Sequence, residues 1–428
     1  MNFLYSFLNF LQPGILFPAL APFKPMLLIS VLAGAAAFTH ADPQLRVGYF
    51  RHPAFIWLCI FMLIQVISVY YSGIRSIIEE LLFWVVYPLF VAVSLLLIRD
   101  AASLRRYVVG MMCGGGFIVG YGLYQAIYHA DELAGGRAGA YGMYENHNDY
   151  TFMIIMLLPY AYMLTHFYRS VLARLLLWAL VAGCAAGVFL SLSRGGILAL
   201  VLECGLLLWL SMKGAKRWIA VAVLCAVGSA AVVYQFAARE ENQAGQYTEA
   251  DAKNSRYELW SAAWNMVLAH PVMGIGSRRF SEYSDDYGEI SHDNRGKVAH
   301  NTLVEIVADT GLLGLSAFLL MLRGLWRATK VELRTESLSR DGIELLQVAT
   351  FVGLIAILMR SMLDAKAHDW SFYFFVVVGI SASTLLARVT LPEQPAAAAE
   401  AAPRTIPPRR PRAFEGGSQR PAIYRRNH

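Results

Sequence analysis

Hydrophobic runs of about 20 residues follow one another along most of the chain, separated by short polar connections. They are too long for strands and lack the two-residue alternation of a half-buried strand. Because only helices or closed barrels satisfy every backbone polar group in lipid, the runs predict an all-α, polytopic membrane protein of about 12 transmembrane helices. The predicted spans lie near residues 3–20, 24–40, 54–72, 76–98, 105–128, 150–167, 172–191, 195–212, 216–236, 300–323, 343–362 and 368–390.

The composition agrees with this class. Of the 428 residues, 57% are hydrophobic and 15% are charged, and the mean hydropathy is +0.47. Soluble domains have roughly 45–50% apolar and 25% charged residues, so an ordinary soluble enzyme and a disordered chain are both excluded. The five cysteines all lie in apolar runs without a CxxC pair, which argues against disulfides and a zinc site. The net charge of +6 is attributed to cytoplasmic loops, and no nucleic-acid partner is expected.

The distribution of basic residues predicts the orientation in the membrane. Most of the 36 lysines and arginines lie in alternate short connections and in the C-terminal tail. Because such residues favour the cytoplasmic side, we expect both termini to be cytoplasmic. Three parts follow: a transmembrane domain over 1–390, a long outward-facing loop within it at 237–299, and a disordered basic tail at 391–428.

This orientation is testable with reporter fusions. A reporter placed after Gln246, in the long loop, and one placed after Ser418, in the tail, are expected to lie on opposite sides of the membrane. Alkaline phosphatase and green fluorescent protein activities at the two positions provide the measurement. Activity of the same reporter at both positions would overturn the orientation.

Arg194 is the most informative charge on the outward side. It lies in a Ser-Arg-Gly-Gly turn between two hydrophobic helices, where an arginine contributes nothing to topology. Glycines allow a ligand close to the backbone, a following helix offers free N–H groups, and a guanidinium binds phosphate oxygens in a fork. The alternative is an arginine that anchors the turn at the membrane surface.

Further candidates lie in the long loop. Ser255 is a predicted helix N-cap, and Arg256, Trp260 and Trp264 share a helix face at i, i+4 and i+8. This face could direct Arg256 to a site, or it could belong to an interfacial helix whose arginine contacts lipid headgroups. A Pro-x-x-Gly-x-Gly segment at 271–276 then precedes Arg278 and Arg279, and is only weak evidence for a phosphate cradle.

Two polar groups stand at membrane entrances. His300 begins an apolar helix and can accept a proton near neutral pH, with Asn301 and Glu305 beside it. Asn301 is alternatively a helix cap, and His300 alternatively a polar interfacial residue. Asn146 and Asn148 flank His147 before another predicted helix and fit either sugar hydroxyls or a solvated cap. We expect no metal and no cofactor, since neither Asp149 nor the acidic 282–289 stretch has ligand spacing.

These motifs resemble those of the O-antigen ligase and polymerase family of bacterial inner-membrane glycosyltransferases. The resemblance extends from about Asn146 to Gly314 and rests on the order of four motifs around a long loop. It implies a fold like that of C-type glycosyltransferases. It also implies that Arg194 and Arg256 bind the diphosphate of an undecaprenyl-linked glycan and that His300 acts at the acceptor. His147 replaces the proline of the family's Asn-Pro-Asn.

The resemblance predicts an O-antigen ligase. It would transfer the glycan, with inversion and without a metal, from undecaprenyl diphosphate to lipid A-core oligosaccharide at the periplasmic face, among membrane lipids. A polymerase and a protein O-oligosaccharyltransferase of the same family are alternatives, although the latter tends to be longer. A twelve-helix transporter is the competitor from another class, but we find neither a repeat nor interrupted helices at the midplane.

Overall fold

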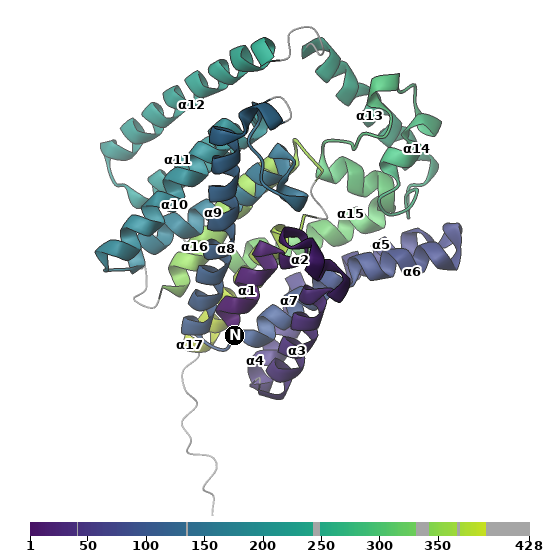
Figure 1. Ribbon diagram of the computed structural model, residues 1–428. Helices are drawn as coiled ribbons and strands as arrows, with labels where there is room; N and C mark the ends of the chain where they lie inside the picture. The colour runs from purple at the N-terminus through teal and green to yellow at the C-terminus, as the bar shows by residue number, and fades with distance from the viewer. Residues whose placement is uncertain (41, 134–135, 243–248, 331–341, 366–368, 391–428) are drawn as a thin grey trace, which may run out of the picture. The chain divides into compact units, whose positions relative to one another are not determined.

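The computed structural model describes residues 1–428 except 41, 134–135, 243–248, 331–341, 366–368 and 391–428. Within this described part every regular element is helical, so the predicted all-α class is confirmed (Figure 1). The tail at 391–428 and both reporter positions lie outside the described residues. The α-helices are α1 (Asn2–Leu11), α2 (Pro13–Leu16), α3 (Pro25–His40), α4 (Pro43–Phe50), α5 (Pro53–Ser68), α6 (Gly73–Trp84), α7 (Val86–Leu97), α8 (Ala101–Tyr128), α9 (His147–Phe167), α10 (Val171–Leu190), α11 (Arg194–Ser211), α12 (Ala215–Asn242), α13 (Glu249–Ala269), α14 (Phe280–Tyr287), α15 (Thr302–Thr329), α16 (Ile343–Ser361) and α17 (Phe372–Thr390).

Eight helical segments of the described chain are long and apolar enough to cross a membrane, and α4 with α5, bent by 55°, would be a ninth. The helices at Pro25–Thr39 and Phe372–Arg388 are apolar but shorter. The predicted first span is not one helix, because α1 ends at Leu11 and is followed by α2 and a 3₁₀ helix, η1 (Pro18–Phe23). Prolines that start both elements, and Pro22 inside η1, remove the backbone donors a continuous helix needs. The chain is therefore a multi-pass membrane protein with fewer long spans than the pattern predicted.

Helix α9 is the buried centre of the transmembrane region. It packs against α8, α10, α11 and α16, and most of its side chains from Tyr150 to Thr165 are buried. Glycine permits close packing around it: a Cβ at Gly115 of α8 would lie 2.2 Å from a methyl carbon of Leu157. Helix α12 lies along α11, beside α10 (Figure 1), and is largely exposed within the span. That exposure suits a helix facing lipid.

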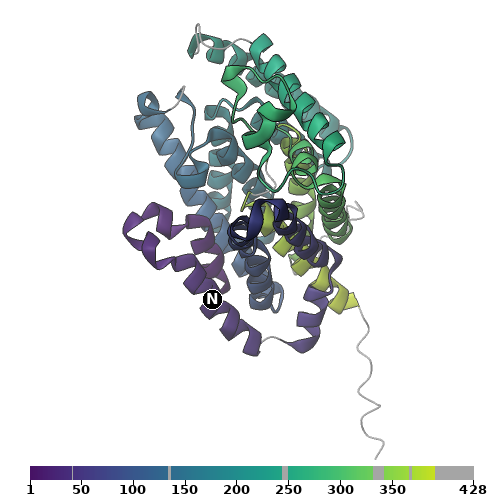
Figure 2. The same ribbon diagram turned by 90° about the vertical axis from the view of Figure 1, so that its right-hand side faces the viewer.

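The long loop has its own small core. Leu259, Ala262 and Met266 of α13 pack with Phe280 of α14 and with Ala308 of α15. Figures 1 and 2 both show α13 and α14, in teal to green, at the end of the helical body away from the end of α17. The loop is thus a folded unit that packs on the start of α15.

Candidate active site

The turn that carries Arg194 is built as the sequence predicted. Ser193 is the N-cap of α11, and its Oγ accepts a hydrogen bond from the N–H of Gly196 at 3.3 Å. Arg194 is the first helical residue and is half-buried. Arg137, from the loop between α8 and α9, donates through Nε to the carbonyl of Ser191 at 3.0 Å. A second guanidinium therefore fixes the turn, a role that no local pattern in the sequence indicates.

The start of α9 lies against the same turn. Asn146 caps α9 by accepting the N–H of Asn148 at 2.8 Å, and Asn148 Oδ1 accepts from Ser193 Oγ at 3.0 Å. These asparagine oxygens therefore hold protein groups. Two helix N-termini meet at this point, and their free N–H groups and positive dipole ends favour an anion.

A buried ion pair at the end of α16 adjoins both helix starts. Arg360 is only 2% exposed, and its Nη2 lies 3.5 Å from Asp364 Oδ2 and 3.4 Å from the carbonyl of Asn148. The guanidinium also packs under the Arg194 turn, since a Cβ at Gly195 would lie 3.4 Å from its Nη1. In the sequence Arg360 and Asp364 are two charges at the end of an apolar run, and nothing local relates them to Arg194 or Asn148. Only the fold brings the end of α16 to this turn.

His300 faces the same carboxylate. Its Nδ1 lies 3.5 Å from Asp364 Oδ1, and about a third of its side chain is exposed (33%). The backbone of His300 has φ +51°, a conformation that is uncommon outside glycine, which re-aims the chain directly before α15. Burial alone would raise the pKa of Asp364, but the hydrogen bond from His300 and the charge of Arg360 outweigh it and lower the pKa. The imidazole thus has an anionic partner on one ring nitrogen, which can leave Nε2 for another group.

The residues after His300 secure its position. Asn301 caps α15 by accepting the N–H groups of Leu303 and Val304, and its Nδ2 donates to the carbonyl of Met362 at 3.2 Å. Thr302 donates to the carbonyl of Asp364 at 2.8 Å, which ties α15 to the loop after α16. The sequence left open whether Asn301 belongs to the site or caps a helix, and in the structure it is the N-cap of α15.

Glu305 holds the segment on the other side of His300. Its Oε2 accepts the N–H of Ala299 at 3.1 Å, and its charge acts on both His300 and Asp364. It is therefore a third ionisable group beside the histidine, and it is a candidate to influence the protonation of the pair.

Arg256 lies on α13, but the predicted start of that helix is wrong. Helix α13 begins at Glu249, so Ser255 is inside it and its hydroxyl donates to Asn294 Oδ1 at 2.7 Å instead of capping. The prediction of a cap at Ser255 failed because a serine hydroxyl inside a helix can instead form a hydrogen bond with another segment. Arg256 is exposed, and its charge acts on Arg360. Trp260, one turn on, donates through Nε1 to the carbonyl of Ala299 at 2.8 Å.

The Pro-x-x-Gly-x-Gly segment serves packing and is not a phosphate cradle. The N–H groups of Ile275 and Gly276 donate to the carbonyls of Ala308 and Asp309, at 3.0 and 2.8 Å. Gly311 has φ +64° where α15 kinks, and a Cβ there would lie 2.3 Å from the backbone of Val272. The glycines of the loop and of α15 therefore permit one close backbone contact, which uses the donors that a phosphate would need.

Arg278 and Arg279 face α6 and neighbouring loop residues. Arg278 Nη2 lies 2.8 Å from Glu80 Oε1, and its guanidinium stacks over Phe83 at 3.8 Å from the ring centroid. Arg279 pairs with Glu282 at 3.1 Å. Both predicted secondary arginines are thus engaged in ion pairs that hold the loop.

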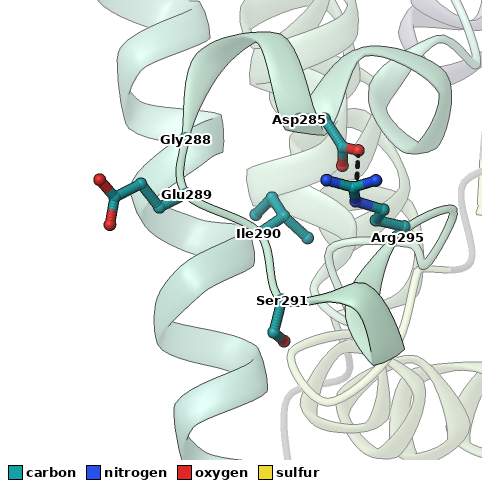
Figure 3. Close-up of a pocket in the computed structure, with 6 residues that line it drawn as sticks. All are labelled: Asp285, Gly288, Glu289, Ile290, Ser291 and Arg295. Atoms are coloured by element: carbon teal, nitrogen blue, oxygen red, sulfur yellow. Dashed lines mark ion pairs between the residues drawn. The ribbon is translucent and has the colours of Figure 1, made fainter.

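A cavity of about 490 Å³ lies in the loop after α14 (Figure 3). It is lined by Asp285, Gly288, Glu289, Ile290, Ser291 and Arg295. Figure 3 shows Arg295 paired with Asp285, and the distance from its Nε to the carboxylate is 2.9 Å. The charged residues of this lining are Asp285, Glu289 and Arg295, so its net charge is negative and unfavourable for a diphosphate. The arginine-rich end of α11 is the better anion site.

Five segments far apart in the sequence thus come together: His300 faces Asp364, the Arg360–Asp364 pair contacts Asn148 and the Arg194 turn, and the charge of Arg256 acts on Arg360. They contribute Asn148, Arg194, Arg256, the His300–Glu305 helix start and the Arg360–Asp364 pair. Positive charge, helix N-termini and a histidine with a carboxylate partner suit a reaction in which an anionic group leaves and a hydroxyl loses its proton. Among the described residues, no group of three or more His, Cys, Asp or Glu side chains is placed to hold a metal ion.

Comparison with known proteins gives two matches. Residues 175–319 match a family model described as O-Antigen ligase, a range that includes Arg194, Arg256 and His300. The chain is also 23% identical over 347 residues to the "Exopolysaccharide production protein ExoQ" of Rhizobium meliloti (strain 1021), covering 77% of each chain. Arg360 and Asp364 lie beyond the range of the family match.

Proposed function

We propose that the chain is an O-antigen ligase of the bacterial inner membrane, a member of the family whose model matches residues 175–319. It transfers a glycan from undecaprenyl diphosphate to lipid A-core oligosaccharide at the periplasmic face. The observation that carries this proposal is that Arg194 at the start of α11 and the His300–Asp364 pair both adjoin Arg360, on which the charge of Arg256 also acts.

The transfer is a single displacement with inversion. The oxygen of an acceptor hydroxyl attacks the anomeric carbon, and the bond from that carbon to the diphosphate oxygen breaks. The electron pair of this bond leaves with the diphosphate, whose developing charge Arg194 and Arg256 stabilise. His300 takes the hydroxyl proton on Nε2, and Asp364 holds the imidazole by Nδ1 and stabilises the cation that forms.

A polymerase is the second candidate, and the relative named for exopolysaccharide production favours it. Its donor and its leaving group are the same, and only the acceptor differs. A protein O-oligosaccharyltransferase would use a serine acceptor with the same machinery. A transporter would place its substrate site near the bilayer midplane, whereas Arg194 and His300 lie at the starts of helices.

The lipopolysaccharide gel pattern of a strain that lacks the protein distinguishes these functions. For a ligase we expect loss of the whole ladder together with accumulation of lipid-linked polymer. A core that carries one repeat unit would identify a polymerase. An unchanged ladder would refute both, and complementation with the wild-type chain is the control.

Transfer is expected to be independent of divalent metal ions. Guanidinium groups at the diphosphate supply the charge that a metal supplies in many other transferases. Purified protein with lipid-linked donor and acceptor is therefore expected to retain full activity in excess EDTA. Loss of activity that is restored by Mg²⁺ or Mn²⁺ would contradict this, and Asp149 and the acidic 282–289 stretch would then be tested as ligands.

A further inference from the structure

Helix α13 carries a second apolar face that its core does not explain. The core face consists of Leu259, Ala262, Ala263 and Met266, which are all buried. Tyr257, Trp260, Trp264 and Leu268 share another face, at spacings of three, four and four residues. Trp264 and Leu268 are each 63% exposed, and Tyr257 is 77% exposed. We refer to these four side chains as the α13 stripe.

The α13 stripe leads into the lipid-facing surface of a membrane-spanning helix. Directly after α13 the backbone carbonyls of Pro271 and Val272 accept the N–H groups of Leu312 and Leu313, at 2.8 and 3.2 Å. Leu312 and Leu313 begin the straight part of α15 beyond the Gly311 kink and are 53% and 46% exposed. Helix α15 as a whole is long and apolar enough to cross a bilayer, so its exposed leucines are expected to face acyl chains. Val272 is exposed beside them, which continues the apolar surface from α15 to α13.

We propose that the α13 stripe lies on the outer surface of the lipid bilayer and binds membrane lipid. Tryptophan and tyrosine favour the headgroup region, where an apolar ring and a polar edge are both accommodated. A helix with one apolar and one polar exposed side binds in the plane of that region. About 100° round the helix from Trp264, α13 exposes Asn265, whose amide donates to the carbonyl of Tyr287 at 2.7 Å, and the charge of Arg256 acts on Arg360. The surface is a lipid-docking site that the transfer reaction itself does not require.

Lipid binding at this stripe would also fix the height of the site above the bilayer. The indole of Trp260 belongs to the stripe and donates to the carbonyl of Ala299, the residue before His300. The same helix holds the 291–294 segment, because Glu258 accepts hydrogen bonds from Ser291 and Asn294. The diphosphate of a lipid-linked donor lies at the bilayer surface, because its polyprenyl tail stays in lipid. If α13 is docked on that surface, the height of His300 above it is fixed, and His300 can be level with the bond between sugar and diphosphate.

Nitroxide labels in the full chain, reconstituted in lipid nanodiscs, test the proposal. The five native cysteines are replaced by alanine, and a label is attached at Trp264→Cys or, as the matched control on the polar side, at Asn265→Cys. We expect the label at 264 to be relaxed several-fold more by oxygen, which partitions into lipid, than by a water-soluble nickel chelate, and the label at 265 to show the reverse. This readout is independent of glycan transfer, so it can fail without affecting the proposed function.

Three results would overturn the proposal. The label at 264 could be relaxed mainly by the nickel chelate, which would place the stripe in water. It could be protected from both agents, which would mean that a protein covers it. Both labels could report lipid, which would mean that α13 is immersed and does not lie on the surface. If the variants do not fold, the unmodified protein is photolabelled with diazirine-bearing phospholipid, and peptide mapping is expected to find adducts within 257–272 and none within 280–295. The opposite distribution of adducts would refute the docking site.

Discussion

Replacement of Arg194 or Arg256 by alanine is expected to lower glycan transfer by about 100-fold or more, the usual effect of removing a group that stabilises transition-state charge. Arg194 begins α11, where the helix N-terminus adds its own attraction for an anion, and the charge of Arg256 acts on the adjacent cluster. Arg194→Lys keeps the charge but loses the forked pair of donors, so it is expected to be impaired as well, although less than the alanine variant. Initial rates with purified donor and acceptor provide the measurement.

Arg278 and Arg279, which lie in the long loop with Arg256, provide the control. Arg279→Ala removes a partly exposed pair with Glu282 and weak contacts with Tyr283 and Ser76, and is expected to leave transfer within about threefold, because none of these groups belongs to the site. Arg278→Ala leaves the nearly buried Glu80 without its guanidinium, so it is expected to lower the thermal unfolding temperature of the purified protein. Normal activity of both Arg194→Ala and Arg256→Ala, at wild-type expression, would refute the diphosphate assignment.

The fold class could be read from the sequence because a bilayer imposes one strong rule on every span. Apolar runs of sufficient length predicted the helices, including α8, α9, α10 and α11, close to their observed bounds. The first run failed because hydropathy does not register what Pro13, Pro18 and Pro22 do to backbone hydrogen bonds. The start of α13 failed for a related reason, since the residues before Ser255 have no hydrophobic period from which to extend the helix.

The site was only partly predictable, for reasons of distance in the sequence. Arg194, Arg256 and His300 stood out because each carries charge or a proton acceptor beside a turn or a helix start. Arg360 and Asp364 are four residues apart and pair with each other, but their other partners, on α9, at the Arg194 turn and at His300, are brought to them only by tertiary packing. The Pro-x-x-Gly-x-Gly segment was only weak evidence for a phosphate cradle, because glycine permits close approach equally to a phosphate or to another backbone.

The His300–Asp364 pair leads to the second large effect. His300→Ala is expected to leave donor binding nearly unchanged, since the arginines hold the diphosphate, and to lower transfer by roughly 10²–10⁴-fold, the range of general acid–base catalysis. His300→Gln still forms hydrogen bonds but does not take the proton, so it is expected to be impaired to a similar degree. The matched control is His270→Gln in the same loop, where the ring pairs with the Tyr287 hydroxyl and transfer is expected to be normal.

The dependence on pH separates a base from a residue that only positions the acceptor. The hydrogen bond from His300 and the charge of Arg360 lower the pKa of Asp364, so its carboxylate stays ionised near neutral pH. A rise of the wild-type rate with pH would then report loss of the imidazolium proton, because a protonated ring cannot accept another. This rise is expected to vanish in His300→Ala and to persist in Glu305→Gln, which removes the other carboxylate that acts on the ring.

Asp364→Asn tests whether the carboxylate acts through the histidine. Without the negative charge 3.5 Å away the imidazolium loses stabilisation, so the midpoint of the rise is expected to move to lower pH while the maximal rate falls. A purely structural role in holding Arg360 would lower activity and thermal stability but leave the midpoint in place. Wild-type transfer by His300→Gln would remove the base role altogether. The acceptor hydroxyl would then attack unassisted, and stabilisation of the leaving diphosphate by Arg194 and Arg256 would be the main source of rate enhancement.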